Sequence, residues 1–326
     1  MKPQIAAVLS LMCLAFVARA AEPAPAIPDP DDVEISVAPR LPAAAPAPPP
    51  KKIEEITVFG FQDDLARDFV KSYATPVSST GQIARWRKPI CPSVLGLVDF
   101  QGALVANRVR AAAAKVGAPV VIQKVGDDKV RPCKPNVWII FSSKAQDIMN
   151  EVRRKAPWIL GFHYYAQAKK LATITNTAQS WYATETVDAK GMARLDSTDT
   201  EAISSNGDMV TTAWQGGRLK TGMRNQFADA LIVVDFTKIS GVPLPSIADY
   251  VAMLALAQTK TFDTCRGVPS ITNLFAPGCD AANKARLMSD ADVAYLRALY
   301  QMDTEASPAL QQTELAQRMA RNLAGK

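Results

Sequence analysis

The uneven distribution of proline limits which part of the chain can fold into a packed core. Ten of the 23 prolines fall between residues 21 and 50, mixed with alanine and with Asp29, Asp31 and Asp32. Such a segment has too few large apolar side chains to bury, and proline removes backbone donors that helices and sheets need. We expect a proline- and alanine-rich tether over residues 21–51, a globular domain over 52–305, and an amphipathic C-terminal helix over 306–326.

The first twenty residues have the pattern of a secretory signal peptide. Lys2 precedes an apolar run from Ile5 to Val17, and the following Ala-Arg-Ala matches an A-x-A cleavage site. A membrane-spanning helix needs about 20 apolar residues, and neither this run nor any later segment reaches that length. We expect a signal peptide over residues 1–20, export to the periplasm or the extracellular space, and no transmembrane segment.

Four cysteines remain after the expected cleavage: Cys91, Cys133, Cys265 and Cys279. An even number of cysteines in an exported protein favours disulfides. Of the three possible connectivities, their order in the chain favours Cys91 with Cys133 and Cys265 with Cys279. A structural zinc site would need closely paired ligands, but the chain has no C-x-x-C spacing. We expect two disulfides, no metal and no cofactor.

The charge balance argues against one class of partner. The chain has 37 Lys and Arg against 31 Asp and Glu, a formal net charge of +6, and the two signs are interspersed. A groove for nucleic acid requires a basic stripe with interleaved aromatic residues, which the sequence lacks. We expect no nucleic acid, and a partner that is another cell-envelope protein or a peptide.

The apolar pattern predicts an α+β fold with a mixed sheet. β-branched and aromatic runs predict strands over residues 54–60, 119–125, 136–141 and 230–236. Apolar residues at helical spacing predict helices over residues 100–116, 143–154, 246–258, 289–300 and 308–323. Ser143 is expected to cap the second of these helices. Strands alternate with helices early in the chain and helices collect late, which indicates α+β.

The stretch "GVPLPSIADYVAMLALAQ", residues 241–258, can be laid on the zinc-peptidase pattern H-E-x-x-H-x-x-G-x-x-H. In that pattern three histidines bind zinc and the glutamate activates water. Ala248, Ala252 and Gln258 then occupy the three ligand positions. Asp249 occupies the position of the glutamate, and Ala255 that of the glycine.

The residues that follow extend this comparison. "PSITNLF" is similar to the S-I-M-N Met-turn of metzincins, and "LMSDADVAYLRALY" is similar to the L-S-x-x-D helix of matrixin-like members. Residues 245–300 therefore resemble a degenerate metzincin. The resemblance implies a zincin-like C-terminal half without its zinc site, because alanine offers a metal no ligand and the single histidine, His163, lies elsewhere.

A second interpretation of residues 246–258 needs no ancestry. Ser246 and Asp249 have the spacing of a capping box, as do Ser289 and Asp292 before the later helix. The apolar residues of the first helix would face the core, while its alanines would let another element pack closely. On this interpretation Asp249 satisfies backbone donors and has no catalytic role.

Three further groups are candidates for function. His163, in "LGFHYYAQ", has a side chain that titrates near neutral pH, so a hydrolase of non-zinc chemistry using Asp249 with His163 is the alternative function. A groove for a ligand is expected at Ala248, Asp249, Ala252 and Gln258. A basic-aromatic patch that grips an anion is the third candidate, formed by Arg85, Trp86, Arg87 and Lys88.

Three short stretches, "ICPSVLGL", "ANRVRAAAAKVGAPV" and "CKPNVWIIF", resemble a family of uncharacterised exported proteins of Gram-negative bacteria. This resemblance implies a location and no activity. The leading expectation is therefore a non-catalytic binding or assembly module of the cell envelope. A weaker expectation is that the C-terminal helix docks a partner through Leu315, Met319 and Leu323.

Overall fold

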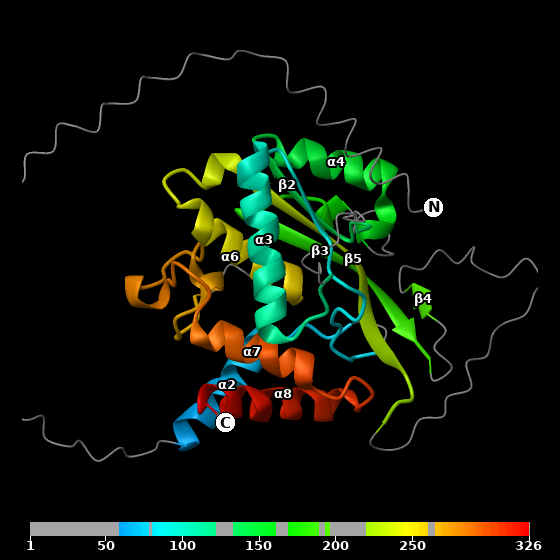
Figure 1. The fold of residues 1–326 in the computed structure, drawn as a ribbon, viewed down its shortest axis with the longest axis vertical. Coiled ribbons are helices and arrows are strands. Elements are labelled where there is room, and N and C mark those ends of the chain that lie inside the picture. Colours follow the sequence, from blue (N-terminus) through cyan, green and yellow to red (C-terminus); the bar gives the residue numbers. More distant parts are fainter. Residues whose placement is uncertain are drawn as a thin grey trace, which may run out of the picture. The chain divides into compact units, whose positions relative to one another are not determined.

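A five-stranded sheet with mixed strand directions organises the fold in the computed structural model (Figure 1). The structure describes residues 59–77, 80–121, 133–160, 169–188, 193–195, 220–259 and 265–325. The expected signal peptide and tether lie outside these residues, as do His163 and most of the strands expected over 54–60 and 119–125. Phe59 and Gly60, expected to end a strand, instead begin a helix.

The sheet has the strand order β1-β2-β5-β3-β4. Its members are β1 (Pro92–Leu95), β2 (Val137–Ser142), β3 (Ala178–Val187), β4 (Ala193–Leu195) and β5 (Arg224–Asp235). The first, second and fifth strands are parallel, while β3 runs antiparallel to both β5 and β4. Five of the six residues of β2 are buried, as expected for an apolar strand covered on both faces. The expected mixed sheet is confirmed, and so are the strands at 136–141 and 230–236.

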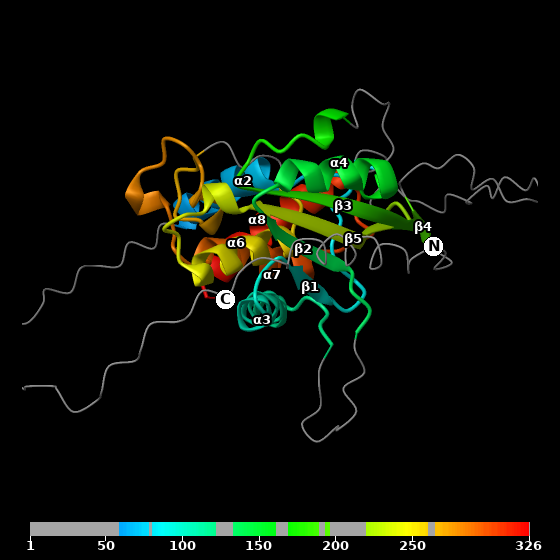
Figure 2. The same ribbon diagram turned by 90° about the horizontal axis from the view of Figure 1, so that it is seen from above.

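Helices flank this sheet and form a layer at one end of it. Within the described residues the α-helices are α2 (Phe59–Tyr73), α3 (Asp99–Val116), α4 (Ala145–Lys155), α6 (Leu244–Leu256), α7 (Asp290–Gln301) and α8 (Pro308–Leu323). The 3₁₀ helices are η1 (Pro157–Leu160), η2 (Phe236–Lys238), η3 (Ile271–Asn273) and η4 (Ala281–Asn283). Helices α3 and α4 lie on opposite sides of the sheet in Figure 2, and α2, α7 and α8 pack together in Figure 1.

A glycine controls how the chain leaves β1. Gly96 follows the strand with φ +85°, a backbone conformation that side-chain-bearing residues rarely adopt. A Cβ atom built on Gly96 would lie 1.9 Å from the carbonyl oxygen of Phe141 in the neighbouring strand. Only glycine allows this approach, which holds the turn into α3 against the end of β2.

Helix α6 lies at the centre of the core. All eleven residues from Ser246 to Leu256 are buried, so the helix has no solvent-facing side over that length. It packs against α3, β5, β3 and η3. A helix that is apolar on all sides is typical of such a central position.

The expected capping residues are wrong for two helices and confirmed for one. Helix α6 begins at Leu244, two residues before Ser246, and Pro245 occupies its first turn. Proline suits the first turn because its fixed φ is helical and its missing N–H costs nothing there. Ser143 does not cap α4, whose N-cap is Lys144. The capping box of Ser289 with Asp292 is present at α7.

Both expected disulfides are present. Cys91 is joined to Cys133, 42 residues away, and Cys265 to Cys279, 14 residues away. The first bond ties the chain entering β1 to the chain entering β2. No helix in the described part of the chain is long and apolar enough to cross a membrane.

The expected C-terminal helix is confirmed as α8, but its apolar face is already occupied. Leu315 and Met319 are fully buried, and Leu323 packs against the same core. Helix α8 contacts both α2 and α7. The prediction that this face docks a partner is therefore wrong.

Candidate functional site

Helix α6 carries the positions that correspond to zinc ligands in the metzincin comparison. Ala248 and Ala252 are completely buried, and Gln258 lies half-buried just beyond the end of the helix. Neither alanine lines an open groove, and neither side chain has an atom that can bind a metal. The local sequence explains this burial, because the residues from 246 to 256 are apolar except Ser246 and Asp249.

The Asp249 carboxylate is engaged by three donors. Arg108 of α3 donates from Nε to one carboxylate oxygen and from a terminal nitrogen to the other, the latter at 3.0 Å. The backbone N–H of Met288 donates to the second oxygen at 2.8 Å. Asp249 is 3% exposed, and the hydrogen bond to it raises the pKa of Arg108. Asp249 therefore joins α6, α3 and the chain before α7, and the expected bond back to Ser246 is wrong.

The C-terminal end of α6 is buried, and three aromatic side chains satisfy its backbone. Tyr182 donates to the carbonyls of residues 254 and 257, at 2.6 and 3.0 Å. Trp86 Nε1 donates to the carbonyl of residue 255 at 2.7 Å, and Tyr300 to that of residue 256 at 2.8 Å. Burial raises the pKa of both tyrosines, which keeps their hydroxyls protonated as donors. The last carbonyls of a helix need such partners when water is excluded.

The expected basic-aromatic patch does not form one surface. Trp86 is 1% exposed and lies in the core, where its ring meets Phe227. Arg85 donates to the carbonyl of residue 299 at 2.6 Å, and burial, with the nearby charge of Arg87, lowers its pKa to about 10. Lys88 pairs with Glu185 at 2.9 Å. The neighbouring side chains thus serve different contacts.

The two short motifs that follow α6 contact each other. The Asp292 carboxylate accepts a hydrogen bond from Ser270 Oγ at 2.6 Å and another from the backbone N–H of Ile271 at 2.8 Å. It also accepts from the backbone N–H and hydroxyl of Ser289 at 2.9 and 2.8 Å. Burial raises the pKa of Asp292. One carboxylate therefore caps α7 and fixes the 3₁₀ turn η3.

Tyr73 of α2 extends this buried polar cluster. Its hydroxyl lies 2.6 Å from Ser270 Oγ and is also hydrogen-bonded to Thr272. Burial is the main cause that raises the pKa of Tyr73 to about 12, and the negative charge of Asp292 adds to it. All four residues are essentially inaccessible to solvent. Hydroxyl groups beside a carboxylate also occur in catalytic sites. Because this cluster is buried, it is instead a structural network that joins α2 to α7.

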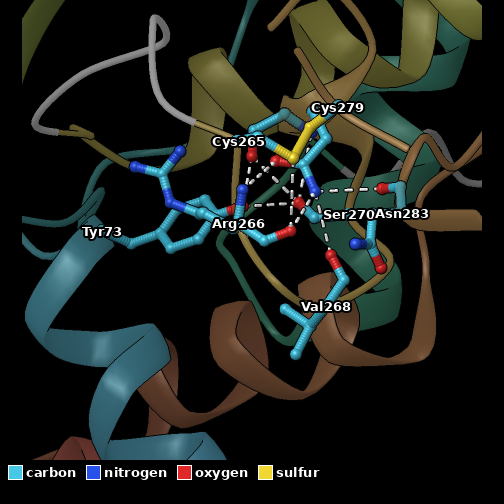
Figure 3. The surroundings of a disulfide bond; sticks show 9 residues. Tyr73, Cys265, Arg266, Val268, Ser270, Cys279 and Asn283 are labelled. Carbon is cyan, nitrogen blue, oxygen red and sulfur yellow. Dashed lines mark hydrogen bonds between the residues drawn. A yellow bond between two sulfur atoms is a disulfide. The ribbon is translucent and has the colours of Figure 1, made fainter. Parts of the chain in front are cut away.

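The Cys265–Cys279 disulfide lies beside this cluster (Figure 3). The Arg266 guanidinium lies 3.9 Å from the centre of the Tyr73 ring and donates to the Ser72 carbonyl at 3.1 Å. Asn273 accepts from the N–H of Arg266 and donates to three backbone carbonyls, those of residues 266, 268 and 283. The disulfide loop is thus packed against α2 and cross-linked internally by the hydrogen bonds of Asn273.

A depression between α2 and α8 contains none of the predicted site residues. Its volume is about 440 Å³, and it is open to solvent. Its lining combines polar and apolar atoms and comes from Asp63, Arg67, Val70, Lys71, Gln312, Thr313, Ala316 and Gln317. The polar side chains in this lining are all exposed, and its two buried residues, Val70 and Ala316, are apolar.

Sequence reasoning missed the partners of the predicted residues. Arg108 appears in the sequence as one basic residue on an exposed helix face, and no local pattern connects it with Asp249, 141 residues later. Tyr182 and Tyr300 are also distant in sequence from the carbonyls that they bind, by 72 and 44 residues. Among the residues that the structure describes, no three His, Cys, Asp or Glu side chains are grouped as metal ligands. Comparisons of the chain with protein-family models, curated proteins and solved structures found no match.

Proposed function

We propose that this protein is an exported, non-catalytic binding or assembly module of the cell envelope, built on a degenerate metzincin-like scaffold. The observation that carries the proposal is the state of Asp249. Both carboxylate oxygens accept hydrogen bonds, and the residue is 3% exposed. A general base needs an oxygen within hydrogen-bond reach of the proton that it removes. Asp249 instead holds three parts of the fold together.

The contact between the two short motifs supports the metzincin-like ancestry. Ser270 belongs to the segment that is similar to a Met-turn, and Asp292 belongs to the L-S-x-x-D helix. Their direct hydrogen bond gives a physical reason for the two motifs to occur together. The turn η3 also packs against α6, so helix, turn and helix form one unit.

Two features support export. The disulfides join all four cysteines that follow the expected signal peptide, and disulfides persist in oxidising compartments. The pattern of the first twenty residues points to the same destination.

Hydrolysis assays test the proposal against its alternative, a hydrolase that uses Asp249 with His163. The wild-type chain and the Asp249→Asn variant would be compared on denatured casein and on a nitrophenyl ester. The proposal expects both chains to match the rate without protein. A wild-type rate above that background, lost in a variant that still folds at the assay temperature, would reject the module and favour the hydrolase.

The binding role needs a separate positive result. A photo-crosslinking amino acid placed at exposed positions of the exported chain should yield one discrete complex with an envelope component in intact cells. Crosslinks spread over many components, or none from any exposed position, would contradict an assembly role.

A further inference from the structure

Helix α3 is apolar on two opposite sides, and only one of them is buried. Its buried side contributes Val105, Ala106, Val109, Ala112, Ala113 and Val116 to the core. Its outward side carries Phe100, Leu104, Asn107, Ala111 and Ala114, all of them exposed. Phe100 is 73% exposed and Leu104 39%, and Val98 just before the helix is 57% exposed. A surface helix ordinarily presents polar residues to solvent.

The outward residues have a regular spacing. The steps from Phe100 to Leu104, Asn107, Ala111 and Ala114 are four, three, four and three residues. This is the seam of a heptad repeat, in which residues at two positions of each heptad face a partner helix. Small residues such as alanine let two helix backbones approach closely. We call these five residues the α3 seam.

The charged residues beside the α3 seam are basic. Heptad positions that flank the seam fall on residues 101, 103, 108, 110 and 115, and the three charged ones are Arg108, Arg110 and Lys115. Arg108 pairs with Asp249, and Arg110 donates to Asn107. Within the described residues no carboxylate forms an ion pair with Arg110 or Lys115. Flanking charges decide which helices pair, so this seam fits acidic flanks.

We propose that the α3 seam binds an amphipathic helix of another protein whose flanking residues are acidic. A second copy of the chain fits poorly, because parallel pairing places Arg110 beside Lys115 and antiparallel pairing places Arg108 beside itself. A lipid surface also fits poorly, since Asn107 and the two alanines offer little apolar surface to insert. The inference rests on the proposed function in one respect, the existence of an envelope partner.

Two synthetic peptides test the proposed preference of the α3 seam for a helix with acidic flanking residues. Both have 21 residues with leucine at the seam positions of each heptad; one has glutamate at the flanking positions and the other has lysine. Fluorescence anisotropy of each labelled peptide with the full exported chain should show saturable binding of the glutamate peptide, at least about tenfold tighter than that of the lysine peptide. Raising the salt concentration should weaken it.

Variants connect that binding to the helix. Leu104→Glu should weaken binding of the glutamate peptide at least about tenfold. Leu310→Glu, at a leucine of similar exposure on α8, should leave that binding unchanged. The pair Arg110→Glu and Lys115→Glu should reverse the preference in favour of the lysine peptide. Circular dichroism and the melting temperature show that each variant is folded.

Several results would overturn the inference. These are no binding of either peptide, equal binding of both, or an equal loss in the Leu310→Glu variant. Leu104-dependent binding to phosphatidylglycerol vesicles without peptide binding would identify a lipid surface instead. Leu104-dependent self-association in sedimentation velocity would identify a second copy. None of these outcomes bears on the hydrolysis assays, so the inference and the proposed function can fail separately.

Discussion

Asp249 accepts hydrogen bonds from two nitrogens of Arg108 and from the backbone of Met288. Replacing the Asp249 carboxylate by an uncharged amide would leave a weaker hydrogen-bond acceptor at this buried position. It would also leave the Arg108 guanidinium without its counter-charge. Arg108 is 43% exposed, so water compensates part of that loss. The residue is thus expected to matter for stability rather than for chemistry.

Asp249→Asn should lower the free energy of unfolding by about 2 kcal/mol, because it weakens a charge-assisted contact and places an amide donor against one of the donors that the carboxylate accepted from, which in the better orientation of the amide is Arg108 Nε. Urea denaturation measures the change. Asp64→Asn is the matched control: it breaks the exposed pair with Arg67 and should cost no more than about 0.5 kcal/mol. Equal stabilities of the wild type and Asp249→Asn would contradict this role.

Tyr73 gives a prediction for alkaline pH. Its pKa rises from 10.0 to about 12 on folding, so between these values the native state holds a proton that the unfolded state has lost. Stability therefore falls as the pH rises through this window, by roughly 3 kcal/mol at most from this residue. Tyr73→Phe lacks that contribution. Its deficit at pH 7, from the two lost hydroxyl contacts, should narrow between pH 10 and 12.

Urea denaturation of both chains from pH 7 to 12 measures this narrowing. Other buried tyrosines titrate in both chains, so the difference between the two curves isolates Tyr73. A deficit that stays constant or widens over the window would show that the Tyr73 proton is not held by the fold.

At the scale of elements, the sequence was most informative where apolar pattern alone decides the structure. The strands at 136–141 and 230–236 and the helices containing Leu254, Leu299 and Leu315 were all predicted from local residues. Caps were less predictable. Helix α6 begins at Leu244, with Pro245 in its first turn and ahead of Ser246, whereas Ser289 caps α7 as expected. The residue at which a helix begins depends on which of several suitable neighbouring residues occupies the first turn or the N-cap.

The partners of these elements were not predictable. Trp86 reads as part of a basic surface patch, because three of its neighbours are Arg85, Arg87 and Lys88. It lies in the core instead, where its indole N–H donates to a carbonyl at the end of α6, 169 residues away. Such long-range pairings follow from the packing of the whole core, and the spacing of residues along the sequence does not predict them.

The turn between β1 and α3 gives an element-scale prediction. Gly96→Ala should destabilise the protein by at least about 3 kcal/mol, since it adds a clash with Phe141 to the strain of a positive φ. Gly117→Ala, after α3, is the control: its φ is +80°, but nothing lies within 4 Å of the added Cβ. That change should cost about 1 kcal/mol. Similar melting temperatures of the two variants would disprove the close approach of Gly96 to the Phe141 carbonyl.

At the scale of the whole molecule, the disulfides and the core have separate roles. The Cys265–Cys279 bond closes a loop of 14 residues that packs against α2 and α7 through its polar contacts. The Cys91–Cys133 bond closes a much longer one. Neither bond replaces the hydrophobic core, in which α6 is central.

Replacing Cys265 and Cys279 by serine should lower the free energy of unfolding by about 3 kcal/mol, because the unfolded chain regains the entropy of a loop of this size. Thermal unfolding of the exported double variant measures the loss. The variant should remain folded at 25 °C. A variant that is unfolded at that temperature would mean that the disulfide, and not the core around α6, holds this half of the protein together.

We expect α6 to be a structural helix that binds no zinc in the present-day protein. This can be tested by elemental mass spectrometry of residues 21–326, exported so that the disulfides form and then dialysed. Less than about 0.1 zinc atom per chain is expected, because Ala248 and Ala252 supply no ligands. About one zinc atom per chain that survives dialysis would show that α6 belongs to a working metal site and would restore a metal-dependent function.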